Sequence, residues 1–222
     1  MNYLVIDIET VPNEKLTDDE KPKFNPDDVK LGNIKDPAKI AEKINQAKEE
    51  FNINLIKQMS LDPCYCQIVS MSYQRLDSEL NEIDTNVMGV HGNEDSSLLE
   101  IFNAIWNRSD VLVGWNIKDF DIPVIRMRQI KNGCLNPMFH IPSYSKIRNP
   151  YSNELCIDLM NEFSDKMMSL DKAAKILLGK SKSDSGSDIY TYWKNKEFDK
   201  IVNHNKEDVS LTTEIFKKLM GC

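Results

Sequence analysis

The chain opens with an apolar run that ends in two acidic residues, and this opening constrains the fold more than any other feature. The run Tyr3–Ile6 is typical of a buried strand, where charged side chains are rare. Asp7 and Glu9 follow it two positions apart, so strand alternation directs both carboxylates to one face of the sheet. Adjacent carboxylates resist ionising together unless a positive group lies between them, and a divalent cation would supply that charge. A solvated strand end is the alternative, and the pair alone leaves it open.

The composition excludes several classes of protein. A chain of 222 residues with 41% hydrophobic and 28% charged residues is typical of one large globular domain. It contains no apolar stretch of about 18 residues and no secretory signal, so we expect a soluble, cytoplasmic protein without contact to a membrane. The five cysteines lack paired CxxC spacing, which favours reduced thiols over zinc ligands.

The net charge of −7 argues against broad electrostatic binding to duplex nucleic acid. It does not exclude a nucleic-acid enzyme, because cations neutralise a carboxylate-rich metal site once they bind. Basic residues cluster locally at Arg126–Lys131 and Leu178–Lys182. Such clusters are more often solvated surface than phosphate contacts.

Hydrophobic periodicity predicts an α/β sheet of mixed direction. After the first strand, further strands are expected at Gln67–Tyr73, Asn86–Val90, Val111–Trp115 and Leu155–Asp158, the first two of these as a hairpin. Helices are expected at Ser96–Trp106, from Asp121 to about Ile130, and at Ser169–Leu178, Ile189–Lys194 and Ile201–Met220.

Residues 13–62 are expected to form a partly helical insertion between two strands. Asn13–Gly32 is polar and predicts an irregular excursion, whereas Asp36-Pro37 supplies a capping residue and a proline at the first helical position. One apolar stripe then follows at helical spacing, formed by Ile40, Ile44, Ala47, Phe51 and Leu55. The favoured interpretation packs this stripe on the domain; a substrate-covering arm and a dimer contact are the alternatives.

Two further acids stand where functional groups gather in such sheets. Asp121 follows a predicted buried strand and opens a helix, where a plain helix cap is, taken singly, the commoner explanation, and Asp119 competes for either role. Asp208 lies four residues after His204, so both occupy one face of the last helix. Taken singly, Asp208 would be interpreted as a solvated residue.

The order of these motifs resembles that of the DEDD family of 3′–5′ exonucleases, which have a ribonuclease H-like fold. The branch related to the proofreading domain of family-B DNA polymerases is the most similar. The matching motifs are Asp7-Ile-Glu9-Thr10, Asn116-Ile-Lys-Asp-Phe120-Asp121 and His204-Asn-Lys-Glu-Asp208. The segments Ile157–Met160, Ser169–Lys180 and Asp184–Gly186 are also similar, so the resemblance covers the chain apart from much of the insertion.

The resemblance implies one exonuclease domain over residues 1–222, with a central mixed five-stranded sheet flanked by helices. It also implies that Asp7, Glu9, Asp121 and Asp208 bind two Mg²⁺ or Mn²⁺ ions and that a nucleoside 5′-monophosphate is released. Thr10, Asn116 and Phe120 are implied contacts of the terminal nucleotide, although Phe120 is equally well a core residue. Asp158 is interpreted as structural.

One position departs from the family pattern. The branch with this spacing usually has a tyrosine where this chain has His204, three intervening residues before the last aspartate. A histidine could act as a base towards the attacking water near neutral pH, whereas a tyrosine would mainly orient it. The catalytic interpretation is favoured over a surface histidine in an impaired enzyme.

Single-stranded nucleic acid is the implied partner, with DNA favoured over RNA. An exoribonuclease that trims RNA ends and a nucleic-acid-binding module without catalysis are the alternatives. Separate replication or repair proteins are a further expectation at the level of the family.

Overall fold

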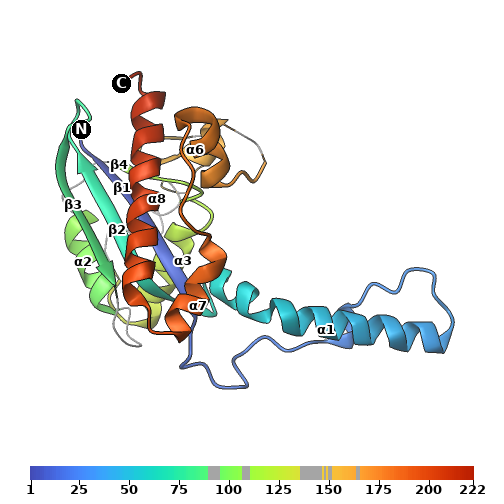
Figure 1. Cartoon of the computed structure of the whole chain (residues 1–222). Coiled ribbons are helices and arrows are strands. Elements are labelled where there is room, and N and C mark those ends of the chain that lie inside the picture. Colours follow the sequence, from blue (N-terminus) through green and yellow to red (C-terminus); the bar gives the residue numbers. More distant parts are fainter. Residues whose placement is uncertain (90–95, 107–110, 136–146, 148, 150–151, 164–165) are drawn as a thin grey trace.

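The computed structural model describes residues 1–89, 96–106, 111–135, 147, 149, 152–163 and 166–222. Its five-stranded sheet has the order β3-β2-β1-β4-β5 (Figure 1). The central strand β1 (Tyr3–Pro12) is antiparallel to β2 (Cys66–Leu76) and parallel to β4 (Val111–Gly114). At the edges, β3 (Glu82–Gly89) pairs antiparallel to β2, and β5 (Cys156–Asp158) pairs parallel to β4. The expected mixed five-stranded α/β sheet is therefore confirmed.

The first strands are longer than their apolar runs predict. β1 continues to Pro12 because it pairs with β2 over its whole length, so Asp7 and Glu9 lie within the strand and not after it. The pairing register shifts between Glu9 and Thr10. The hairpin of β2 and β3 is confirmed. β2 continues to Leu76 and β3 begins at Glu82, so both strands extend into the segment between the expected strands; Val90 lies outside the described residues.

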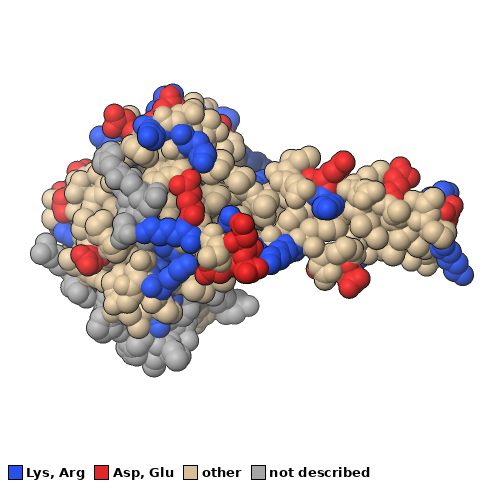
Figure 2. All heavy atoms as spheres, turned by 90° about the horizontal axis from the view of Figure 1, so that it is seen from below, with Lys and Arg blue, Asp and Glu red and all other residues tan. Residues whose placement is uncertain are grey.

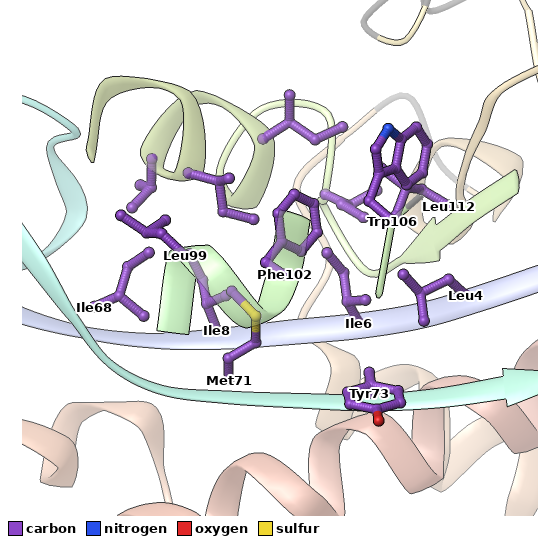
Figure 3. Close-up of a cluster of buried hydrophobic side chains, with 14 of the residues drawn as sticks. Leu4, Ile6, Ile8, Ile68, Met71, Tyr73, Leu99, Phe102, Trp106 and Leu112 are labelled. Carbon is purple, nitrogen blue, oxygen red and sulfur yellow. The ribbon is translucent and has the colours of Figure 1, made fainter. Parts of the chain in front are cut away.

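Helices cover both faces of the sheet. Leu4, Ile6 and Ile8 of β1 belong to one buried cluster, together with side chains of α2 (Ser96–Trp106) and α3 (Asp121–Lys131) (Figure 3). Val5 belongs to the opposite cluster, with α6 (Leu170–Leu178) and α8 (Phe198–Leu219). Since alternate residues share a face, Asp7 and Glu9 lie on the α8 side of the sheet.

Among the described residues, three shorter helices also lie in this part of the molecule. They are α5 (Leu159–Phe163), η3 (Gly186–Asp188) and α7 (Ile189–Lys194). The sequence predicted α7 but not α5, which has too few residues to show a helical period. None of the helices in the described ranges has the length and apolar character needed to cross a membrane.

Helix α1 (Pro37–Leu61) extends away from the sheet as an arm (Figure 1). It begins as predicted: the Asp36 carboxylate accepts a hydrogen bond from the Ala38 N–H at 2.9 Å. Only Met59, near its end, is buried.

The apolar stripe of α1 contacts the chain that precedes the helix. The Phe51 ring lies 5.8 Å from the Phe24 ring, and Lys43 Nζ donates to the Lys30 carbonyl at 2.7 Å. The expectation that the stripe packs on the body of the domain is wrong for this part of α1. The reason is that the polar excursion, whose regular structure is the single-turn η1 (Pro26–Asp28), runs alongside the helix and covers the stripe locally.

Candidate active site

A tight turn after β4 places Asp121 against β1. A Cβ atom at Gly114 would lie 2.7 Å from the Ile117 Cβ, so the turn requires glycine there. Asn116 adopts a positive φ of 59°, which asparagine tolerates better than most residues. The turn brings the buried Asp121 carboxylate to the Ile8 N–H, which donates to Oδ1 at 3.2 Å. Asp121 therefore lies at the strand position between Asp7 and Glu9, whereas Asp119 is exposed.

Helix α8 brings the third motif over the same strand. His204 Nε2 lies 3.4 Å from Glu9 Oε1 and 3.7 Å from Asp208 Oδ2. One potential ligand atom from each of these three residues lies within 4.8 Å of the others, a spacing that could hold a metal ion. The fold thus brings together three of the residues that the sequence singled out, Glu9, His204 and Asp208.

Asn205 connects Asp7 to the same helix. Its side-chain amide donates to Asp7 Oδ2 at 2.5 Å, while its oxygen accepts from the Ser70 hydroxyl at 2.9 Å. All of this lies on the α8 side of β1 and β2, where Asn205 and Ser70 are buried. The amide fixes the orientation of the Asp7 carboxylate.

Lys182 is the positive group within the cluster. Its Nζ donates to Asp208 Oδ2 at 2.5 Å and lies 3.2 Å from His204 Nε2, and its side chain is 12% exposed. Burial lowers the pKa of Lys182, but the charges of Asp208, Asp7 and Glu9 outweigh this effect and raise it. Lys182 is therefore a charged ammonium, and the expectation of solvated surface for its cluster is wrong at this position.

The partners of His204 fix the orientation of its ring. Its Nδ1 contacts the Asp184 carboxylate, an acceptor, so Nδ1 carries a proton. Its Nε2 lies between the Lys182 ammonium, which can only donate, and the Glu9 and Asp208 carboxylates. The contact with Asp184 thus directs Nε2 of the ring towards Glu9 and Asp208.

Burial and mutual repulsion make the carboxylates costly to ionise. Burial, followed by the charges of Asp208, Glu9 and Asp121, raises the pKa of Asp7 well above its usual value. Burial and the charge of Asp208 do the same to the pKa of Glu9. Burial raises the pKa of Asp121 to about 8, and it raises that of Asp208 despite the nearby Lys182.

This donor set fits hard divalent cations. Such ions prefer carboxylate oxygens, and their charge would offset the burial and the repulsion that raise the four pKa values. Asp208 Oδ1 is buried without a hydrogen-bond partner among the described residues, and the Lys182 ammonium occupies a place beside Oδ2 where positive charge is needed. The residues that could hold the ions are Asp7, Glu9, Asp121 and Asp208.

The remaining candidate residues have different surroundings. Thr10 is buried and its hydroxyl donates to the Ser60 carbonyl of α1 at 2.6 Å. Phe120 is partly buried and lines a groove together with Glu9 and Thr10. Asn116, by contrast, does not line that groove, and its N–H donates to Asp158.

Asp158 supports the turn that carries Asp121. Its carboxylate accepts backbone N–H groups of Asn116, Lys118 and Met160 at 3.0, 3.0 and 3.2 Å. These bonds satisfy the buried carboxylate at the end of β5 and hold the turn after β4 against it, in agreement with a structural role.

Sequence reasoning missed Lys182, Asp184 and Asn205. Lys182 and Asp184 lie two positions apart in a non-helical segment. In an extended chain this spacing directs both side chains to the same side, and it was the signal that could have identified them. The intervening Ser183 contacts a different residue of α8, because its N–H and hydroxyl both donate to Glu207, which lies outside the carboxylate cluster. Asn205 lies three residues before Asp208, so helical spacing placed it on the same face.

The fold and the acidic cluster define the class of the protein: a ribonuclease H-like α/β protein with a carboxylate site on the central strand. Residues 60–221 match the family described as predicted 3′–5′ exonucleases related to the exonuclease domain of PolB. The chain belongs to this family, which confirms the enzyme class expected from the sequence. The matched region contains Asp121, His204 and Asp208, whereas Asp7 and Glu9 precede it.

Among solved structures, the chain is similar to the family B DNA polymerase from the hyperthermophilic archaeon Pyrobaculum calidifontis. The two share 19% identity with a TM-score of 0.62, over 99% of this chain and 24% of the polymerase. At this identity the match shows the fold, and the chain spans about a quarter of the polymerase. Comparison with curated protein sequences gives no match.

Proposed function

We propose that the protein is a metal-dependent 3′–5′ exonuclease that releases nucleoside 5′-monophosphates from the 3′ end of single-stranded DNA. The observation that carries the proposal is the convergence of Asp7, Glu9, Asp121 and Asp208, from three separate elements, into one largely buried cluster. Burial, together with neighbouring charges, raises the pKa of each carboxyl group. Asp121 and Asp208 are buried and Asp7 and Glu9 are partly buried, so four ionised carboxylates would destabilise the fold unless the site serves a purpose such as binding cations.

The side chains divide the work of hydrolysis. Two divalent cations held by the four carboxylates would lower the pKa of a bound water and stabilise negative charge at the phosphorus. His204 Nε2 faces the cluster, and in the proposed mechanism it accepts a hydrogen bond or a proton from the attacking water. Lys182 adds positive charge beside Asp208, where a phosphate would approach.

We expect Mg²⁺- or Mn²⁺-dependent release of mononucleotides from a single DNA strand labelled at its 3′ end. The strand should shorten one nucleotide at a time, and a strand with a blocked 3′-hydroxyl end should be degraded more slowly. The same assay with an RNA strand of equal sequence and salt separates the two substrates. Faster release from RNA would identify RNA as the preferred substrate. No release from either strand would reject the proposal in favour of a binding module.

We expect His204→Ala to lower turnover by about 10–100-fold, a typical loss when a residue that orders the reacting groups is removed. His204→Tyr should retain more activity than His204→Ala, because the related branch has tyrosine at this position. Asn203→Ala, an exposed neighbour on α8, is the matched control. Turnover of His204→Ala equal to that of the control would assign His204 to a structural role.

A further inference from the structure

A groove leads from the carboxylate cluster to the arm. It has a volume of about 580 Å³ and is lined by Glu9, Thr10, Ile53, Ile56, Lys57, Ser60, Leu61, Phe120, Ser185, Gly186, Ser187 and Tyr190. Ligand pockets in proteins typically have volumes of about 300–1,000 Å³. Because Glu9 belongs both to the cluster and to the lining, the groove is continuous with the candidate active site.

One wall of the groove is a single face of α1. Ile53, Ile56, Lys57, Ser60 and Leu61 recur at helical spacing. This face lies opposite the stripe that packs on the preceding chain, since Ile53 and Lys57 each follow a stripe residue by two positions. The arm therefore has two apolar faces, and its own chain covers the first of them.

The face of α1 that lines the groove is apolar, yet much of it is exposed. Ile53, Ile56 and Leu61 are 78%, 37% and 53% exposed. Three large aliphatic side chains that lie together at the surface, next to a candidate catalytic cluster, are typical of a contact site.

The opposite wall carries aromatic rings. Phe120 and Tyr190 are both partly buried, so each is held in place while part of it faces the groove. Aromatic rings stack on nucleic-acid bases without regard to sequence, and a lysine binds phosphate as a point charge. On the face shown in Figure 2, acidic and basic side chains are interspersed along the arm, so a broad basic band does not provide the binding there.

We propose that this face of α1 binds the single-stranded substrate, with bases against Ile53 and Ile56 and a phosphate at Lys57. This inference rests on the proposed function, which identifies the molecule that occupies the groove as the single-stranded substrate. It goes beyond the family, because Ile53, Ile56 and Lys57 precede the region that matches, which begins at residue 60. It assigns the arm the role of a substrate-binding wall instead of a dimer contact.

Two substrates of different length test the proposal. A chromogenic phosphodiester, the p-nitrophenyl ester of thymidine 5′-monophosphate, reaches the catalytic cluster without filling the groove. A single DNA strand of 20 nucleotides should occupy both the catalytic cluster and the groove. We expect Ile53→Glu combined with Ile56→Glu to lower kcat/KM on the strand by about 10-fold, with little change on the ester. Ile176→Glu, at an exposed isoleucine of α6, is the matched control.

Lys57→Ala gives a second measurement. For one phosphate contact on a single strand, the slope of log Kd against log salt concentration should fall by about 0.7. Lys48→Ala, an exposed lysine of α1 outside the groove, should leave the slope unchanged.

Photocrosslinking separates this inference from the proposed function. A strand with 4-thiothymidine near its 3′ end should crosslink to peptide 53–61. Crosslinks confined to other segments, or equal loss of activity on ester and strand, would overturn the role of α1 while leaving the nuclease intact. Hydrolysis of neither substrate would reject the proposed function, and the crosslink would then decide alone whether α1 binds the strand.

Discussion

Asp121→Asn is expected to reduce mononucleotide release by about 100-fold or more, the cost of removing one preorganised charged group from a site of this kind. Asparagine keeps the shape of the side chain and an oxygen that accepts from the Ile8 N–H. What it loses is the negative charge that, in the proposed mechanism, binds a cation. The loss should therefore appear in turnover and metal dependence and leave the fold intact.

Stability separates this loss from misfolding. Because burial and nearby carboxylates raise the pKa of Asp121 to about 8, removing its charge should raise the thermal midpoint of the metal-free protein at pH 8. Asp119→Asn, at an exposed residue two positions earlier, is the control for both measurements. Asp7→Ala should likewise abolish release. Undiminished activity in Asp121→Asn or Asp7→Ala would contradict the assignment of the metal ligands.

Divalent cations are expected to stabilise the protein strongly and more so at high pH. At a concentration about a hundredfold above Kd, binding contributes about 2.7 kcal/mol, which shifts the midpoint of a chain of this size by about 5–10 °C. Removal of the metal with a chelator should abolish hydrolysis together with this shift.

The direction of the pH effect follows from the carboxyl groups. In the unfolded chain they titrate near pH 4, whereas the folded pKa of Asp121 is about 8 and those of Asp7, Glu9 and Asp208 are also raised. The folded state thus binds more protons within this window, so the cluster lowers the stability of the metal-free protein as the pH rises from about 4 to about 8. Cations compete with these protons for the same oxygens, so their stabilisation should be larger at pH 8 than at pH 5.5.

Differential scanning at both pH values, with and without Mn²⁺, measures this effect. Surface groups also titrate in this range, so the informative quantity is the difference between the wild type and Asp121→Asn. A midpoint shift with Mn²⁺ that is equal in both proteins, or larger at pH 5.5, would indicate that the ion binds elsewhere.

Local patterns in the sequence predict most of the sheet and the helices around it. The Tyr3–Ile6 run, the cap at Asp36 and the period of the last helix all depend on neighbours within a few residues, which is why they could be inferred. Strand ends were less well predicted, because the length of β1 depends on pairing with β2, about 60 residues away in the chain.

The spacing of Asp7 and Glu9, and the order of the later motifs, could be interpreted from the sequence because alternation and motif order are properties of the chain itself. Tertiary structure decided what surrounds those acids. Lys182 reaches Asp208, Asp184 orients His204, and Asn205 joins Asp7 to Ser70 across 198 and 135 positions of sequence. It also directed a second face of α1 towards the groove, since the preceding chain covers the first face. Such contacts depend on how separate elements pack, and no local period encodes that.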